Sequence, residues 1–553
     1  MKRYNIFLQF LIILFVANIA MSCILDDDEG DTDGDTDGDI DTDGDVDGDV
    51  GEVVAKYNSG DTATLKFTSG DEVYQIVPYF ASTVESEAGY SITVGDSSAN
   101  GTAGKIKKTA RSFRSAKPEW ISEVRYRQVL ARQKWSVLQH QLKKQVAAKG
   151  VFNQDVFKSA KINAKLSSEC ASDELYRDGV CTNEFDLTFM DFDEDETEIT
   201  VQVKAKGEHV AVVVDSDDTV AQADIDNILN KFDTIIYPRN QFFSGGSTFD
   251  GIDYVDRDGD GMHMIVLTHL VNDMDAVGLF NPADFGPDLN VSDILYVVLP
   301  DADNPMESIL GTIAHEYYHM LMYGIKRAKF GTLETLWLDE DLAHLFEDVS
   351  GYGGDNLDIT AAYLESPANT TWAFSFDNQE TEARGMGYLI MRYLFEQKGG
   401  VTYSSSNAAD ITDNGGATFI ASLLQTDNKG FDAIDDALSG SDSWKNSFFD
   451  WLAAVSLDET SMNAGSKYGY NAIETDSITG QKRGVCTHCS RDSIYGYTVD
   501  FDGLSTTALS GGKTDGIVSA SGAVANKLTG NSDQEIVLQA DDDDILFGVF
   551  RVK

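Results

Sequence analysis

The feature that most constrains this chain is the segment His315-Glu316-Tyr317-Tyr318-His319, which carries two imidazoles four residues apart. On an α-helix such residues share one face, so both rings can bind a single metal ion while Glu316 lies beside them. Apolar side chains repeat at the same spacing, at Ile309, Ile313, Tyr317 and Leu321. The pattern predicts a buried helix with a zinc site, in which His315 and His319 are ligands and Glu316 is the general base.

A third ligand is expected downstream, because a catalytic zinc ion normally takes three protein ligands and keeps one open position. The metzincin continuation is absent, since Met322 and Ile325 stand where it requires Gly and His. A second helix is predicted over residues 335–348, and it carries Glu340 and, one turn later, His344. We predict Glu340 as the third ligand. His344 is either an alternative ligand or a group that supports the ligands or packs beside them.

The residues around Glu340 carry a resemblance to a known family. Trp337-Leu338-Asp339-Glu340, followed by Ala343-His344, resembles the WLNEGLSH segment of hyicolysin-type metallopeptidases. The glutamate of that segment matches the third zinc ligand of gluzincins such as the thermolysin and aminopeptidase groups, which implies the same role for Glu340. The resemblance covers roughly residues 185–455 through further segments in the same order: Gly207-Glu208-His209, residues 210–214, Ile236-Tyr237-Pro238, residues 256–261 and residues 387–394.

The family resemblance implies a zincin-like metallopeptidase domain of the α+β class. Its N-terminal part is expected to be β-rich and its C-terminal part helical, with small β-rich domains on both sides. Two positions depart from the family pattern, because Asp339 stands where the family usually has Asn, and Asp341 where it has Gly. Neither removes a proposed ligand, but an added negative charge beside a ligand is expected to alter the metal-bound water.

The activity implied by the resemblance is hydrolysis of peptide bonds in protein or peptide substrates. Zinc lowers the pKa of its bound water, Glu316 takes the proton, and the hydroxide attacks the peptide carbonyl. Tyr388 is a candidate hydrogen-bond donor to the oxyanion, or else a core residue. The GxMEN-type segment of the aminopeptidases is absent, which favours an endopeptidase. The alternative is a catalytically weak or inactive peptidase-fold adhesin or binding protein with calcium sites.

The amino terminus predicts export and lipidation. Two basic residues precede an apolar run over residues 6–19, and Ala20-Met21-Ser22-Cys23 resembles a bacterial lipobox. Residues 1–22 are therefore predicted to be a lipoprotein signal peptide and Cys23 the lipidated residue, the alternative being an ordinary secretory peptide. The expected location is the bacterial cell envelope, periplasmic or cell-surface, with membrane contact through the lipid anchor only.

Acidic segments suggest a tether and a calcium site. Residues 23–50 combine the lipidated cysteine with an Asp/Gly repeat that has too little apolar content to fold alone, which predicts an extended spacer. Within residues 256–261, Asp256, Asp258 and Asp260 occupy positions 1, 3 and 5 of an EF-hand-like loop, but position 12 is Leu267. The loop is either a calcium site completed from elsewhere or an acidic turn between strands.

Charge and cysteine content limit the remaining possibilities. The net charge of −50 argues against a nucleic-acid partner. Residues 105–165 are the exception, with sixteen Lys or Arg and a helical pattern over residues 118–148. This segment is a propeptide-like clamp on the acidic domain, a contact to anionic lipid or polymer, or a solvated interdomain helix. Local disulfides are expected between Cys170 and Cys181 and between Cys486 and Cys489.

These observations predict the following organisation: signal peptide 1–22, lipidated tether 23–50, small β domain 51–104, basic helical linker or propeptide-like segment 105–183, zinc metallopeptidase domain 184–457, and β-rich C-terminal module 458–553.

Overall fold

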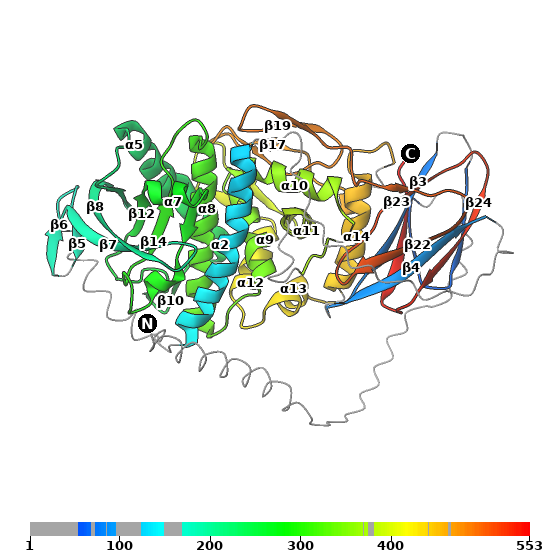
Figure 1. Cartoon of the computed structure of the whole chain (residues 1–553), viewed down its shortest axis with the longest axis horizontal. Helices are drawn as coiled ribbons and strands as arrows, with labels where there is room; N and C mark the ends of the chain where they lie inside the picture. The colour runs from blue at the N-terminus through cyan, green and yellow to red at the C-terminus, as the bar shows by residue number, and fades with distance from the viewer. Residues whose placement is uncertain are drawn as a thin grey trace, which may run out of the picture. The chain divides into compact units, whose positions relative to one another are not determined.

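The computed structural model describes residues 53–67, 72–83, 86–95, 123–148, 169–177, 179–368, 370–373, 381–440, 442–462 and 466–553 (Figure 1). The predicted signal peptide, Cys23 and the acidic tether lie outside these residues. None of the helices in the described ranges is both long and apolar enough to cross a bilayer. The described part is a mixed α+β structure, in agreement with the predicted class.

A six-stranded mixed sheet forms the first half of the predicted peptidase domain. Its order is β13 (Gly278–Phe280), β14 (Ile294–Val297), β12 (His263–Leu267), β9 (Val210–Asp215), β8 (Glu196–Lys206) and β7 (Glu184–Met190). Strands β9, β12 and β14 are parallel, and β13 runs antiparallel to β14 at one edge. The central strands are buried along their whole length, which explains their continuous apolar sequences.

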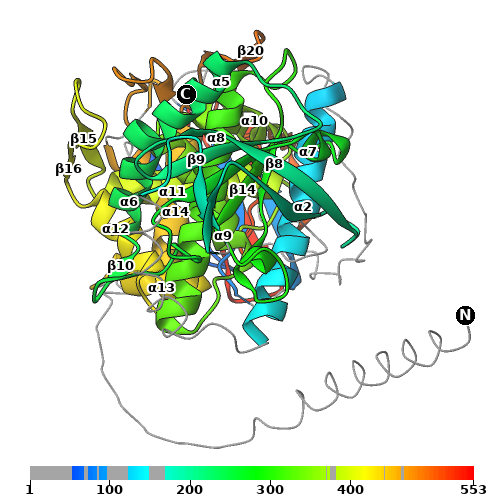
Figure 2. The same cartoon turned by 90° about the vertical axis from the view of Figure 1, so that its left-hand side faces the viewer.

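The second half of this domain is mainly helical, as the sequence predicts. Its longer helices are α8 (Met306–Tyr323), α9 (Leu336–Val349), α10 (Asn356–Glu365), α11 (Thr381–Gln397) and α14 (Trp444–Leu457). Helix α8 is buried on all sides from Ser308 onward, and it lies behind the sheet in Figure 2. A Cβ at Gly311 would lie 2.7 Å from the Tyr352 carbonyl oxygen. The small residue therefore permits the close packing that holds the histidine-bearing helix in the core.

The two β-rich modules predicted at residues 51–104 and 458–553 are not separate domains. Their strands alternate within two sheets. The first has the order β1 (Val54–Tyr57), β25 (Ile545–Arg551), β3 (Val73–Phe80), β23 (Asn526–Thr529) and β21 (Thr507–Ala508). The second has the order β2 (Thr62–Leu65), β24 (Gln534–Ala540), β4 (Glu87–Val94) and β22 (Gly512–Ser519). The N-terminal strands are hydrogen-bonded to C-terminal ones, not to one another. Neither module could form its backbone hydrogen bonds alone, so the prediction of two separate β domains is wrong.

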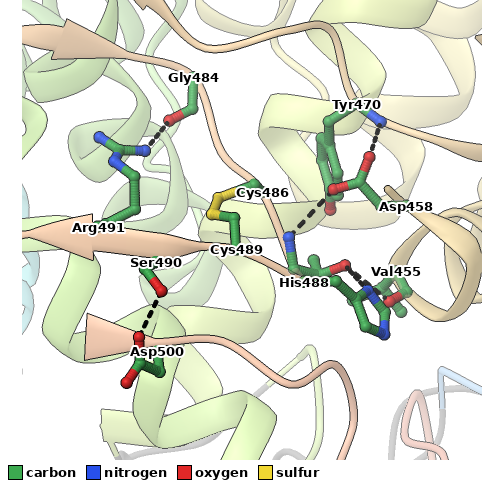
Figure 3. The surroundings of a disulfide bond; sticks show 11 residues. Val455, Asp458, Tyr470, Gly484, Cys486, His488, Cys489, Ser490, Arg491 and Asp500 are labelled. Carbon is green, nitrogen blue, oxygen red and sulfur yellow. Dashed lines mark hydrogen bonds between the residues drawn. A yellow bond between two sulfur atoms is a disulfide. The ribbon is translucent and has the colours of Figure 1, made fainter. Parts of the chain in front are cut away.

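Residues 466–500, also assigned to the C-terminal module, instead lie on the helical part. The Thr487 N–H donates to Asp458 Oδ2 over 3.0 Å, and the Tyr470 N–H donates to Asp458 Oδ1 over the same distance. Cys486 is joined to Cys489 in this segment, beside the end of α14 (Figure 3). Cys170 is joined to Cys181 before the first strand of the sheet. Both pairs are those expected from the sequence.

Helix α2 (Glu123–Ala148) is the described part of the basic segment, and it is not solvated. One face of the helix is buried, including Trp135, Leu138, Leu142 and Val146. Its polar side chains reach the helical part: Arg125 Nε lies 2.9 Å from Asp358 Oδ2, and Gln128 Nε2 donates to Asn304 Oδ1 over 2.7 Å. The solvated interdomain helix is therefore wrong for these residues. Figure 1 shows α2 running alongside α8 and α9.

Candidate metal centre

Three ligand groups from two helices converge in the core. His315 and His319 come from α8 and Glu340 from α9, and each is about 1% exposed. The two Nε2 atoms are 3.1 Å apart, and the Glu340 carboxylate oxygens lie 3.7 Å from His315 Nε2 and 3.6 Å from His319 Nε2. Ligands around a tetrahedral zinc ion, with Zn–N near 2.0–2.1 Å, are separated by about 3.3 Å. The spacing of the three groups therefore fits one metal ion.

Two carboxylates orient the imidazoles. His315 Nδ1 lies 2.7 Å from Glu347 Oε1, and His319 Nδ1 lies 3.0 Å from Asp339 Oδ1. These contacts favour a proton on each Nδ1, which leaves both Nε2 lone pairs directed at the common centre. Burial lowers the pKa of His315 to about 4, so this ring is neutral at pH 7 and able to bind a metal.

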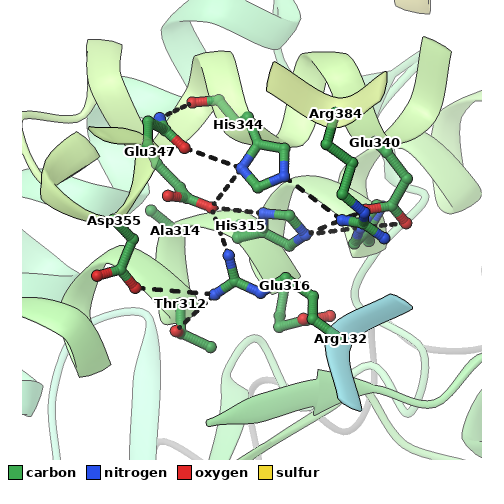
Figure 4. Close-up of polar contacts among 12 residues, drawn as sticks. Arg132, Thr312, Ala314, His315, Glu316, Glu340, His344, Glu347, Asp355 and Arg384 are labelled. Atoms are coloured by element: carbon green, nitrogen blue, oxygen red, sulfur yellow. Dashed lines mark hydrogen bonds and ion pairs between the residues drawn. The ribbon is translucent and has the colours of Figure 1, made fainter. Parts of the chain in front are cut away.

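Glu340 is ionised although it is buried. Burial by itself would raise its pKa, but the Arg384 guanidinium and the two imidazoles hold the pKa of Glu340 well below its usual range. Arg384 Nη1 donates to Glu340 Oε2 over 2.7 Å (Figure 4). The centre therefore combines two imidazole nitrogens with a charged carboxylate, a donor set suited to zinc.

Glu316 lies between the metal ligands and the edge of the sheet. Its Oε2 accepts a hydrogen bond of 2.9 Å from the backbone N–H of Phe280, on edge strand β13. Gln139 of α2 donates to the Phe280 carbonyl over 2.9 Å, and its Nε2 is 3.5 Å from Glu316 Oε2. Burial raises the pKa of Glu316 to about 7, against the opposing effect of His319. A carboxylate of this pKa can both take up and release a proton near neutrality.

His344 does not join the His315, His319 and Glu340 group. Its Nδ1 lies 2.9 Å from Asn356 Oδ1 and 3.2 Å from Glu347 Oε1. His315, His344 and Glu347 also lie close enough to hold an ion. However, Arg384 Nη1 is 3.4 Å from His344 Nε2 and Arg132 Nη1 is 3.5 Å from Glu347 Oε1. In addition, Nδ1 of both His315 and His344 lies within hydrogen-bonding distance of Glu347 Oε1, so these atoms are already paired and His344 has the supporting role (Figure 4).

Tyr388 lies apart from the proposed ligands. It is buried on α11, one turn after Arg384, and lines a small pocket with Gly353, Asn356, Leu357, Thr360, Gly484, Val485, Cys486, Arg491 and Phe501. This pocket contains none of the three ligands and does not contain Glu316. The position fits the core role considered for Tyr388, whereas Arg384 is the residue of α11 that reaches the centre.

The carboxyl of Asp341 is enclosed between α9 and α11. Its Oδ2 accepts a hydrogen bond of 2.9 Å from Trp372 Nε1, and its carboxyl packs against Gly387, where a Cβ would lie only 1.8 Å from Oδ1. Burial raises the pKa of Asp341 well above its usual range, which favours the neutral carboxyl. Burial therefore opposes the added charge expected at this position, because the side chain fills a space between α9 and α11.

Asp339 is ionised, and its charge is balanced. Burial by itself would raise its pKa, but Lys143 of α2 and His319 lower the pKa of Asp339 to about 2. Lys143 Nζ donates to Asp339 Oδ2 over 2.6 Å. The Asp339 carboxylate therefore interacts both with α2, through Lys143, and with His319, a proposed zinc ligand.

The acidic loop brings three carboxylates together. Ligand atoms of Asp256, Asp258 and Asp260 lie within 4.8 Å of one another. Burial, with the charges of Asp293 and Asp258 next in importance, raises the pKa of Asp256 to about 8. The carboxylates therefore repel one another when ionised, which a bound cation would relieve.

Several residues that matter at the centre were not found from the sequence. Glu347 follows Glu340 by seven residues, two turns along the same helical face, and this periodicity could have revealed it. Gln139, Lys143 and Arg384 have no comparable signal, because each reaches the centre from a distant segment.

A scan against protein-family models and a search of curated proteins both find no match to this chain. The centre itself therefore defines the class: a mixed α+β protein with a buried group of residues that can bind a metal ion.

Proposed function

We propose that this chain is a zinc endopeptidase with a zincin-like domain related to hyicolysin-type peptidases of the gluzincin group. The observation that carries the proposal is the convergence of His315, His319 and Glu340 beside Glu316. Bound zinc would supply a Lewis acid that polarises a carbonyl group and lowers the pKa of a water molecule. The proposed substrates are proteins or peptides.

The roles of the chain's own residues follow from their contacts. Glu347 and Asp339 hold the two imidazoles with Nε2 toward the centre. Glu316, with a pKa of about 7, would take a proton from water at its carboxylate and return it to the leaving amine. The N–H of Phe280 keeps that carboxylate in position. Edge strand β13 offers backbone groups to which an extended peptide could pair.

We also propose a propeptide-like role for α2. Gln139 of α2 donates a hydrogen bond to the Phe280 carbonyl, a group with which an extended substrate would have to pair. The proposed zinc ligands and Glu316 are all buried. A peptide cannot reach residues that are 1–2% exposed, so α2 would have to move or be removed before cleavage.

The proposed location is the bacterial cell envelope, with a lipid anchor at Cys23 and no nucleic-acid partner. It rests on the lipobox-like sequence, which lies outside the described residues. A calcium ion at Asp256, Asp258 and Asp260 is proposed as a stabilising cofactor, separate from the zinc.

The test is metal analysis combined with cleavage of casein. The purified protein should contain about one zinc per chain, and a chelator should abolish its cleavage. Glu316→Gln should keep the zinc and the fold but lose cleavage. The alternative function, a non-catalytic adhesin, is favoured by the complete burial of the site. Zinc-loaded protein that cleaves no substrate in a broad peptide library, even after α2 is displaced, would support this alternative.

A further inference from the structure

We infer that Arg384 is a further catalytic residue of this centre: its guanidinium would bind the carbonyl oxygen of the scissile peptide bond as negative charge develops there. The inference rests on the proposed endopeptidase function. It assigns to Arg384 the role for which the sequence suggested Tyr388.

The first support is the position of the guanidinium. Arg384 is 1% exposed in the first turns of α11. Its Nη1 contacts Glu340 Oε2 at 2.7 Å, and its Nη2 donates to Ser136 Oγ of α2 over 2.5 Å. The contact with Glu340 does not involve α2 and holds the guanidinium directly beside a proposed zinc ligand, and its planar form restricts where its N–H groups point (Figure 4).

The second support is the cavity that Arg384 faces. The side chain lines a cavity together with Arg132, His344, Val277 and Gly278. Gly278 begins edge strand β13, which also carries Phe280, the partner of Glu316. A peptide paired with this edge would run past both Gly278, which lines the cavity with Arg384, and Phe280, which holds Glu316.

The third support is the balance of charge. Glu340 is the only carboxylate with which Arg384 has a described ion pair. A metal bound by Glu340 would share that carboxylate, so the two cations together would exceed its single negative charge. The Arg384 Nε is also buried without a hydrogen-bond partner. An oxygen that gains negative charge in the transition state would supply both the missing charge and an acceptor.

The competing explanation is that Arg384 only balances the charge of Glu340. In that case its loss should weaken zinc binding and leave the turnover of zinc-loaded protein unchanged. The proposal instead predicts retained zinc and lost turnover, so the two explanations differ in a measurement other than activity.

The test uses the full chain with Arg384→Gln and Arg384→Lys, under conditions in which the wild type cleaves a peptide. We expect about one zinc per chain in each variant, little change in KM, and a kcat about 10²–10³-fold lower in Arg384→Gln, the loss typical of one oxyanion donor. Arg384→Lys keeps the charge but not the paired N–H geometry, and should recover only part of the loss.

A second readout is binding of a phosphonamidate peptide, which mimics the tetrahedral transition state. Its affinity should fall by the same factor as kcat/KM. Arg392→Gln is the matched control, because Arg392 is a buried arginine of the same helix that pairs with Asp348 and Glu396, away from the centre. It should keep the wild-type kcat.

Three outcomes would overturn the inference. Turnover of Arg384→Gln within threefold of wild type would exclude the catalytic role while leaving the endopeptidase intact. Loss of zinc in both variants would make Arg384 a positioning residue for Glu340. A wild type that binds zinc but cleaves nothing, with or without α2 displaced, would remove the proposed function, and the inference with it.

Discussion

Lys143 Nζ lies 2.6 Å from Asp339 Oδ2, and the other oxygen of the same carboxylate lies 3.0 Å from His319 Nδ1. One buried carboxylate therefore connects helix α2 to a proposed zinc ligand. Gln139 and Ser136 of α2 also contact Glu316 and Arg384, so this helix contacts the proposed general base and two residues that adjoin the proposed ligands. We therefore expect the position of α2 to affect catalysis in this protein.

Weakening the attachment of α2 should increase cleavage. Arg125→Ala with Gln128→Ala removes contacts to Asp358 and Asn304 and touches none of the proposed ligands. A broken buried ion pair costs about 3–5 kcal/mol, enough to shift an open–closed equilibrium by about 100-fold or more. We expect casein cleavage to rise at least tenfold, measured at equal zinc content.

The control for this prediction is Lys134→Ala, on the exposed side of α2, which should change nothing. If the double variant keeps its zinc and its fold yet cleaves more slowly than wild type, α2 is a permanent wall of the site and not a cover.

Removing Glu347 should weaken metal binding without removing a ligand. Glu347→Ala frees His315 Nδ1, so the ring loses its fixed orientation and its preferred tautomer. We expect zinc affinity to fall about 10–100-fold in competition with a chromogenic chelator. Glu307→Ala provides the control, because Glu307 is an exposed acidic residue on α8, the helix that carries His315. Equal affinities for Glu347→Ala and wild type would contradict the assigned role.

Asp341→Asn should be nearly silent. The raised pKa of Asp341 favours its neutral form, and an amide oxygen can accept from Trp372 equally well. Asp341→Ala should lower the free energy of unfolding by about 1–3 kcal/mol, because the indole N–H loses its acceptor. Urea unfolding and the pH profile of kcat would measure both. A shifted pH profile in Asp341→Asn would mean that Asp341 is ionised.

The acidic loop should make stability depend on pH and calcium. Asp256 has a pKa of about 8 when folded, against 3.8 as its ordinary value, so the folded chain binds more protons between these limits. Without calcium, the free energy of unfolding should therefore fall as pH rises through about 8. Calcium should raise Tm most at high pH, where the carboxylates are ionised.

Thermal unfolding with and without calcium measures this effect. Asp258→Asn should remove most of the calcium-dependent rise in Tm, whereas Asp543→Asn, in an exposed acidic run, should retain it. If calcium raises Tm equally in both variants, the loop is an acidic turn and not a binding site.

The sequence by itself determined the local parts of this protein. The spacing of His315, His319 and the apolar residues between them predicted a buried helix, and the pattern around Glu340 predicted a second one; both are observed. The sequence also predicted both cysteine pairs. These features depend on which residues share a face or lie near one another along the chain, and periodicity encodes that directly.

Only the tertiary structure decided which distant segments meet. It joined β3 to β25 in one sheet, although more than 460 residues separate them, and it laid α2 over Glu316. It also gave Arg384 rather than Tyr388 access to the centre and raised the pKa of Asp341. Long-range pairing and burial set these properties, because the charge of a carboxyl and the partner of a strand depend on surroundings that no local pattern of residues specifies.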